Sequence, residues 1–195
     1  MRVISGRAKG FKLRTVPGDS TRPMMDRIKE NLFNLLGPHF IPGTRWLDLF
    51  AGTGQVGIEA LSRGAREVIF LDNAQPAIRT IQANLEHTKL EEAASVWRID
   101  AFAFLRRHQQ EAFDVIFVAP PQYKEMWEAV LRIVDEEPDR FLSDMGFVIV
   151  QIDPKEYKEL ALERLELYDQ RTYGSTMLCF YEKALDESTT IEESA

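Results

Sequence analysis

The chain of 195 residues has one cysteine, Cys179, and three histidines, and it has no long apolar run. One cysteine cannot form an internal disulfide or a thiolate cage for a metal ion, and the histidines have no spacing typical of metal ligands. Without an apolar stretch of about 18 residues, no transmembrane helix is expected. Residues 1–7 also lack the apolar segment of a signal peptide. These absences predict a protein of the reducing cytoplasm that uses no metal and no membrane.

The charge is unevenly distributed along the chain. The net charge is −7, yet residues 1–29 carry eight lysines and arginines against two aspartates, so this segment has a net charge of +6 and the remainder −13. Like charges gathered at one end are typical of a surface that contacts a polyanion, although a solvated charge run gives the same count. The candidate contact residues are Arg2, Arg7, Lys9, Lys12, Arg14 and Arg22.

The first 40 residues predict a basic hairpin followed by a helix. Residues 2–16 contain two short β-prone runs with a glycine-bracketed basic turn between them. Thr21 is a suitable cap, and Pro23 suits the first turn of a helix that extends to about Leu36. We interpret residues 1–40 as an extension that precedes the main domain.

From residue 44 onward, apolar strands alternate with helices. Such alternation is typical of an α/β fold with a parallel sheet covered on both faces. The last two strands are joined by a tight turn at residues 173–175, so the final strand should run antiparallel. The main domain then covers residues 41–184, and the acidic residues 185–195 predict a disordered tail. The expected strands are residues 46–50, 67–72, 95–99, 113–118, 146–151, 165–168 and 177–181, and the expected helices are residues 54–63, 74–88, 101–109 and 124–136.

The first strand leads into a glycine-rich turn. Residues 52–57 (GTGQVG) match the pattern G-x-G-x-x-G between a strand and a helix, and Asp72 follows the first glycine by 20 residues. Taken alone, this pattern favours a dinucleotide and hence an oxidoreductase, or simply a tight turn. Asp48, at the strand end, argues against a dinucleotide because its carboxylate would repel a pyrophosphate; its alternative role is a cap. S-adenosylmethionine has an ammonium group, a ribose diol and an adenine but no phosphate, and therefore fits better.

Two further strand ends carry candidate residues, since open α/β sheets bind ligands at the carboxyl ends of their strands. Asp100 follows the third strand and is suited either to accept from an adenine amino group or to cap the next helix. The fourth strand ends in residues 119–123 (APPQY). The restricted backbone of Pro120 and Pro121 should aim a carbonyl into the cleft, and Tyr123 is suited to stack on a base. The predicted catalytic residues are Pro120, Pro121 and Tyr123.

The chain resembles the bacterial small-subunit ribosomal RNA guanine-N2 methyltransferases of the RsmD type, from about Arg2 to Lys183. The resemblance implies a class I S-adenosylmethionine-dependent methyltransferase fold, which is Rossmann-like, with a seven-stranded sheet and an RNA-binding N-terminal hairpin. Its partner would be ribosomal RNA or the small ribosomal subunit, and the target base would leave any stack to reach the pocket. The segments that carry the resemblance are residues 2–6 (RVISG), 9–13 (KGFKL), 21–23 (TRP), 26–30 (DRIKE), 32–34 (LFN), 48–54 (DLFAGTG), 57–65 (GIEALSRGA) and 173–176 (YGST).

The resemblance also implies how the cofactor would be held. Asp48 and the glycines would hold its methionine moiety, Asp72 its ribose and Asp100 its adenine, and residues 21–23 would border the cofactor and the target. The full predicted cofactor set is Asp48, Phe50, Ala51, Gly52, Thr53, Gly54, Asp72, Asn73, Asp100 and Ala101.

One departure from the family pattern bears on activity. The family has Asp or Asn, Pro, Pro and an aromatic residue at the fourth strand, whereas this chain has Ala119 and Gln122 at the outer positions and Tyr123 one place late. Losing one polar contact in a transition state costs roughly 3–4 kcal/mol, while positioning supplies roughly 7–11 kcal/mol. Two interpretations follow: an active enzyme that uses the Pro120 carbonyl with a repositioned Tyr123 or Gln122, or a degenerate relative that binds RNA or cofactor without catalysis.

Overall fold

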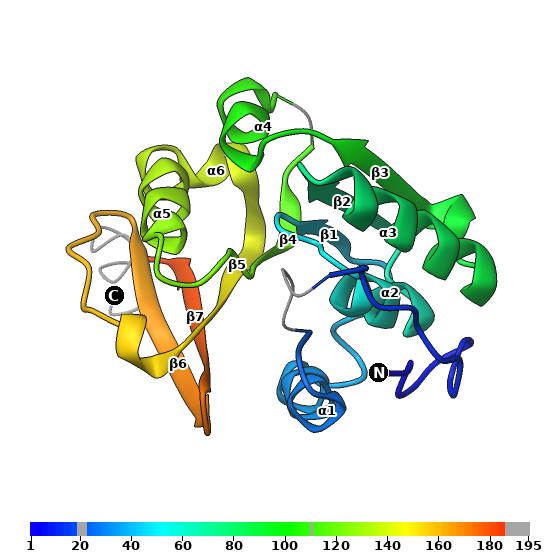
Figure 1. Cartoon of the computed structure of the whole chain (residues 1–195). Helices are drawn as coiled ribbons and strands as arrows, with labels where there is room; N and C mark the ends of the chain where they lie inside the picture. Colours follow the sequence, from blue (N-terminus) through cyan, green and yellow to red (C-terminus); the bar gives the residue numbers. More distant parts are fainter. Residues whose placement is uncertain (19–22, 110, 186–195) are drawn as a thin grey trace.

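The computed structural model describes residues 1–18, 23–109 and 111–185. Seven strands form one sheet in the order β3-β2-β1-β4-β5-β7-β6, and β7 runs antiparallel to both of its neighbours (Figure 1). The predicted α/β fold with an antiparallel last strand is therefore confirmed. The strands are β1 (Arg45–Asp48), β2 (Glu67–Asp72), β3 (Ala94–Arg98), β4 (Phe113–Val118), β5 (Leu142–Ile152), β6 (Leu165–Tyr173) and β7 (Thr176–Lys183).

The helices cover both faces of this sheet. They are α1 (Asp26–Leu36), α2 (Gln55–Ser62), α3 (Gln75–Thr88), α4 (Ala101–Arg107), α5 (Met126–Glu136) and α6 (Pro138–Phe141), with short 3-10 turns η1 (Glu91–Ala93) and η2 (Pro154–Glu156). Because successive side chains of a strand point to opposite faces, β4 sends Phe117 to a core shared with α1, α2 and α3, and Ile116 to a core shared with α4, α5 and α6. None of the helices in the described part combines the length and apolar character needed to cross a bilayer.

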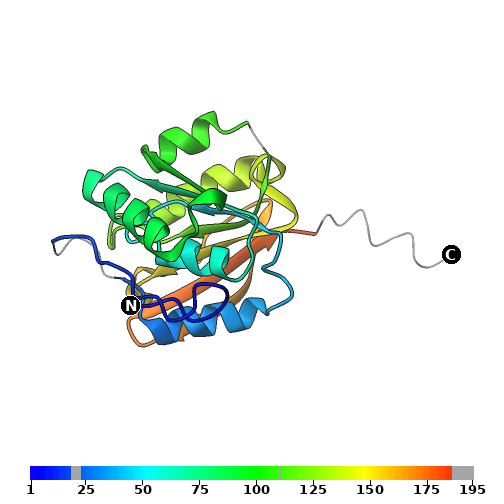
Figure 2. The same ribbon diagram turned by 90° about the vertical axis from the view of Figure 1, so that its right-hand side faces the viewer.

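The N-terminal segment packs on the first of these cores. Val3, Ala8 and Leu13 are buried in the same cluster as Ile28 of α1 and Ile58 of α2. Figure 2 shows the chain start lying beside α1, on the lower side of the molecule. The basic N-terminal segment is therefore packed against the domain that contains the sheet.

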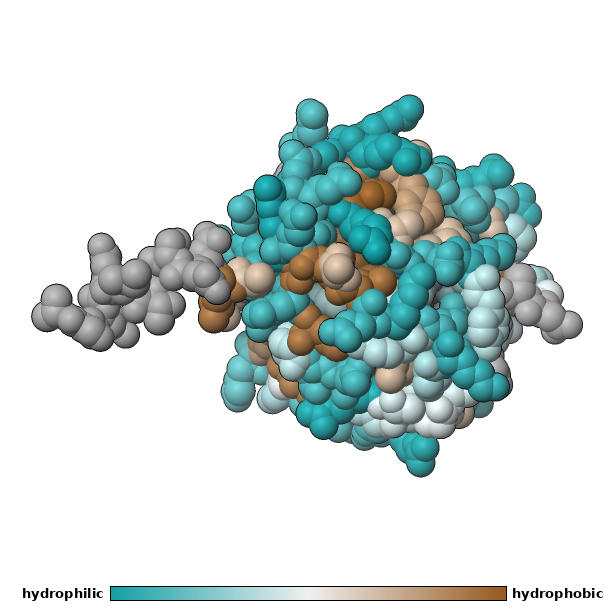
Figure 3. Space-filling model, turned by 90° about the vertical axis from the view of Figure 1, so that its left-hand side faces the viewer, coloured by the Kyte–Doolittle hydropathy of each residue, from teal (hydrophilic) through white to brown (hydrophobic). Residues whose placement is uncertain are grey.

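The opposite edge of the sheet has a different surface. Strand β6 is the last strand in the order, and Glu166, Gln170 and Arg171 are exposed along it. Figure 3, which views the molecule from the side of α5 and β6, shows a mostly hydrophilic surface with a small apolar area. Charged side chains on an edge strand disfavour pairing with another chain.

The N-terminal region keeps one of its two expected features. The two arms of residues 2–16 pair antiparallel, as the predicted hairpin requires, through the Arg2–Lys12 bridge and backbone hydrogen bonds such as Val3 N to Phe11 O at 3.0 Å. The pairing is short, because other backbone N–H groups of the segment donate to side chains and a carbonyl of α2. The start expected for the first helix was wrong. Helix α1 begins at Asp26, since Met25 has an extended backbone, so Pro23 precedes the helix. Thr21 and Arg22 lie outside the described residues, as does nearly all of the expected acidic tail.

Candidate cofactor and substrate site

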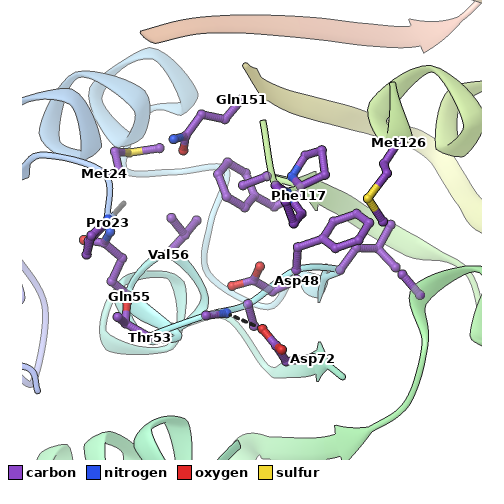
Figure 4. Close-up of a pocket in the computed structure, with 18 of the residues that line it drawn as sticks. Pro23, Met24, Asp48, Thr53, Gln55, Val56, Asp72, Phe117, Met126 and Gln151 are labelled. Carbon is purple, nitrogen blue, oxygen red and sulfur yellow. Dashed lines mark hydrogen bonds between the residues drawn. The ribbon is translucent and has the colours of Figure 1, made fainter. Parts of the chain in front are cut away.

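A cavity of about 540 Å³ opens at the carboxyl ends of β1, β2, β4 and β5 (Figure 4). This is the position at which open α/β sheets bind their ligands. Nine of the ten predicted cofactor residues line it; Gly54 does not, and neither does the predicted catalytic residue Tyr123. The lining residues from the predicted set are Asp48, Phe50, Ala51, Gly52, Thr53, Asp72, Asn73, Asp100, Ala101, Pro120 and Pro121.

The glycine turn is held in shape by Asp72. The Asp72 carboxylate accepts from the Gly52 backbone N at 3.0 Å and from the Ala74 backbone N at 2.8 Å; Figure 4 draws the first of these bonds. Gly54 lies outside the cavity wall and shapes the turn: it is the N-cap of α2 at φ 74°, and a Cβ there would meet Ile81 side-chain atoms at 3.3 Å. A left-handed backbone of this kind favours glycine.

Asp48 is a buried carboxyl group at the end of β1. Burial raises its pKa to about 7, and the negative charge of Asp72 adds to the shift, while a hydrogen bond from the Gly57 backbone opposes it. Figure 4 shows its carboxyl group facing the middle of the cavity. A cationic ligand group placed there would favour the ionised form, so the site is suited to an ammonium group.

Asp100 combines both of the roles that its position suggests. One oxygen accepts from the Ala103 backbone N at 2.9 Å and caps α4. The residue also lines the cavity, as do its neighbours Ile99 and Ala101. Since capping occupies one carboxylate oxygen, the other can accept from a ligand. Asp48, Asp72 and Asp100 thus follow three adjacent strands along one wall.

The predicted target end of the cavity is formed by the loop after β4. Ala119, Pro120, Pro121 and Gln122 line it. Tyr123 is 64% exposed, has a left-handed backbone at φ 59°, and donates its backbone N–H to the Glu156 carboxylate at 2.7 Å. Tyr123 is not among the residues that line the cavity, and its stacking on a base stays a prediction.

Several lining residues are not among those predicted from the sequence. Gln55 is buried, and its Oε1 has no hydrogen-bond partner among the described residues. Met24 and Met126 approach from opposite sides, and Gln151 extends from the end of β5 (Figure 4). Gln151 stands at a strand end and was therefore open to the same rule that selected Asp100; Met24 and Gln55 carried no comparable signal.

The basic segment is anchored through its backbone, which leaves its charged side chains in solvent. Ile4 and Ser5 donate backbone N–H groups to the Glu59 carboxylate at 2.8 and 3.0 Å, and Ala8 donates to the Ser62 hydroxyl at 3.0 Å. A Cβ at Gly6 would lie 1.8 Å from the Ser62 carbonyl oxygen, so this close approach requires glycine. Exposed in this segment are Arg2, Arg7, Lys9, Lys12 and Arg14, while Arg22 lies outside the described residues.

Asn84 of α3 connects the basic segment to the glycine turn. Its Oδ1 accepts from the Arg14 backbone N at 2.7 Å, and its Nδ2 donates to the Arg14 carbonyl at 3.1 Å and to the Thr53 carbonyl at 3.0 Å. The Asn84 side chain is fully buried. One amide therefore fixes the position of Arg14 relative to a residue of the cavity wall.

Comparison with known proteins places this geometry among methyltransferases. The family described as "Conserved hypothetical protein 95" matches residues 1–182. A Bacillus subtilis (strain 168) protein named "Putative rRNA methyltransferase YlbH" is 41% identical over 190 residues, which cover 94% of this chain and 99% of that protein. "Ribosomal RNA small subunit methyltransferase D" of Haemophilus influenzae is 33% identical, covering 93% of each chain. The structure of "Putative methyltransferase yhhF" from Escherichia coli superposes with a TM-score of 0.81 at 27% identity, covering 94% and 97%.

Proposed function

The chain belongs to the family described as conserved hypothetical protein 95, as the resemblance to RsmD-type enzymes predicted, and on that premise we propose that it methylates guanine at N2 in small-subunit ribosomal RNA. The chain is an S-adenosylmethionine-dependent methyltransferase. The relatives' names, which specify ribosomal RNA of the small subunit, support the RNA substrate. The guanine N2 target rests on the resemblance of the sequence motifs. The substrate is either free ribosomal RNA or the small ribosomal subunit.

The row of three carboxylates is the observation that carries the proposal. Asp48 would accept from the ammonium group of the cofactor, Asp72 from its ribose hydroxyls and Asp100 from its adenine amino group. A dinucleotide would place its pyrophosphate against the buried Asp48, which disfavours an oxidoreductase. Bound S-adenosylmethionine supplies an electrophilic methyl group on a positively charged sulfur. The residues of this chain contribute alignment.

The loop after β4 would hold the target amine. The Pro120 carbonyl is the predicted acceptor for an N–H group of that amine, and Ala119 beside it offers none. Because the methyl group moves directly to nitrogen, the chain needs no covalent intermediate and no metal ligand. A catalytically degenerate relative is the second candidate, and Ala119 is the observation that favours it.

Transfer of labelled methyl to small ribosomal subunits that lack the modification tests this function. Nuclease digestion and nucleoside analysis should identify N2-methylguanosine. If no label appears although the same preparation binds the cofactor, the chain is a degenerate binder or acts on another substrate. The Ala119→Asp variant then separates these two: activity that rises from nothing supports the degenerate binder, whereas activity that stays absent points to another substrate. If the unaltered chain is active and Ala119→Asp lowers that activity, the degenerate binder is excluded.

Replacing the exposed cations of the N-terminal segment should weaken RNA binding and its salt dependence together. Each lysine or arginine that neutralises a phosphate contributes about −0.7 to −0.9 to the slope of log K against log salt. A variant with Arg7, Lys9 and Lys12 changed to glutamine should therefore lose up to about two to three units of slope, if all three cations contact phosphates. Filter binding from low to moderate salt measures it. An unchanged slope would remove this segment from the RNA interface.

A further inference from the structure

Gln151 lies beside the position where this chain lacks the family's acceptor. Strands β4 and β5 are parallel neighbours, with Val118 paired with Val150 at their carboxyl ends. The next residues along the two strands are Ala119 and Gln151, so they are neighbours across the sheet. Side chains alternate along a strand, and both therefore share the face of Phe117 and Ile149, which pack in the core of α1 and α2.

The Gln151 amide is available to a ligand. The side chain is half-buried and lines the cavity, and it makes no hydrogen bond with another described residue. Figure 4 shows the amide extending from β5 toward Met24, on the side of the cavity opposite Asp72. Its backbone is fixed, since Gln151 pairs with Leu178 of β7. A fixed backbone with an unpaired amide is a suitable arrangement for contact with substrate.

The longer side chain of glutamine offsets part of the displacement between the two strands. Neighbouring strands lie about 4.7–4.9 Å apart, and glutamine is one methylene longer than the family's Asp or Asn. An amide that starts on β5 can therefore reach the space beyond Ala119 on β4. The Pro120 carbonyl, also in the cavity wall, would supply the second acceptor for an amine with two N–H groups.

We propose that Gln151 is a catalytic residue, whose amide oxygen accepts a hydrogen bond from the target amine in place of the side chain missing at Ala119. The inference rests on the proposed function. As the amine nitrogen forms its bond to the methyl carbon, the carbon–sulfur bond breaks, the sulfur becomes a neutral thioether, and the nitrogen acquires positive charge before it releases a proton to solvent. An acceptor on its N–H therefore binds the transition state more strongly than the ground state.

The central test is the Gln151→Leu variant, assayed for N2-methylguanosine formation on small ribosomal subunits. Removal of one acceptor that acts in the transition state should lower kcat by about 10²–10³-fold. The KM for RNA and the affinity for S-adenosylmethionine should change little, because the ground state uses the contact weakly. Gln170→Leu on the exposed edge strand β6 is the matched control, with unchanged activity expected.

Two further variants separate a chemical role from a structural one. Ala119→Asp in the Gln151→Leu background should recover at least about tenfold of kcat, because it restores an acceptor on the adjacent strand. Gln151→Glu should keep activity at neutral pH and lose it as the new carboxylate is protonated, when assayed at saturating cofactor. A purely structural role predicts neither the rescue nor the new pH dependence.

The outcomes distinguish this inference from the function on which it rests. If the unaltered chain forms no N2-methylguanosine, the proposed function fails and the inference fails with it. If the unaltered chain is active and Gln151→Leu retains its kcat, the inference alone is overturned. A fall in kcat with rescue by Ala119→Asp supports both.

Discussion

Replacing Glu59 with alanine is expected to lower the free energy of unfolding by about 3–5 kcal/mol, because it leaves a buried lysine without its counter-charge. Glu59 and Lys29 are both fully buried, with Lys29 Nζ 3.4 Å from one carboxylate oxygen, and Arg63 Nε donates to the other at 2.8 Å. Desolvation lowers the pKa of Lys29, and the Glu59 charge is the largest opposing influence. The same carboxylate accepts from the Ile4 and Ser5 backbones.

Urea unfolding of the variant measures this loss, and Glu128→Ala is the matched control. Glu128 also lies within a helix and pairs with two cations, Arg132 and Lys158, which are about half exposed. Exposed ion pairs contribute about 0–1 kcal/mol, so the control should change stability little. Equal losses in the two variants would show that the buried cluster contributes no more than a surface pair.

The same substitution should also release the N-terminal segment. With the acceptor for Ile4 and Ser5 gone, trypsin should cleave after Arg7 and Lys9 faster than in the unaltered chain, at a concentration of urea that leaves both folded. RNA affinity should fall at the same time, although no exposed cation has been removed. A lower RNA affinity with all exposed cations present would show that RNA binding depends on the anchoring of the basic segment as well as on its charge.

The buried cluster also shows that one cation of residues 1–29 is not on the surface. Counting residues 1–29 as a surface charge included Lys29, which points into the core and donates to the Arg2 carbonyl at 2.6 Å. Its partner Glu59 is 30 residues away in the sequence, on another helix. Pairing of this kind depends on how α1 packs on α2, and no local pattern in the sequence contains that information.

Elements with a strong local pattern were predicted well. Strands β2 and β4 have the predicted bounds, because each run is rich in Val, Ile and Phe and is followed by a turn or loop. The predicted hairpin of residues 2–16 forms only a short antiparallel pairing, because other backbone donors of the segment bond to α2. The position of Tyr123 outside the cavity lining could not be predicted from local sequence, since the bond of its backbone N–H to Glu156 depends on a tertiary contact.

The site shows the same division. Asp48, Asp72 and Asp100 were found because the rule about strand ends needs only the order of strands and helices. Gln151 stands at such an end as well, but its significance depends on β5 being the neighbour of β4, which fixes it beside Ala119. The lack of an acceptor at Ala119 could be seen in the sequence. The proposal of Gln151 as its replacement depends on the order of the strands in the sheet.

The affinity for S-adenosylmethionine is expected to rise with pH and to level off above about pH 7. Burial raises the pKa of Asp48 to about 7, and the ammonium group of the cofactor should bind the ionised carboxylate. Below that pKa, binding must displace a proton, so the dissociation constant should increase by about tenfold for each pH unit. Titration calorimetry from pH 5 to 8 measures the slope, with proton release confirmed in buffers of different ionisation enthalpy.

Asp48→Asn is the variant that tests the cause, and its effects on binding and stability should have opposite signs. The amide cannot attract the ammonium group, so affinity should fall by about 10²-fold and lose its pH dependence. In the free protein, a pKa raised from the ordinary value of 3.8 means that protonated Asp48 favours the folded state. This contribution to the free energy of unfolding is fully present below pH 3.8 and is lost as pH rises toward 7. Above pH 7, the free energy of unfolding of the neutral variant should therefore exceed that of the unaltered chain by up to about 4 kcal/mol. Urea unfolding measures the difference. If Asp48→Asn binds the cofactor more weakly but is no more stable, the ionised Asp48 carboxylate does not destabilise the free protein. The pH dependence of binding would then arise from a different titrating group.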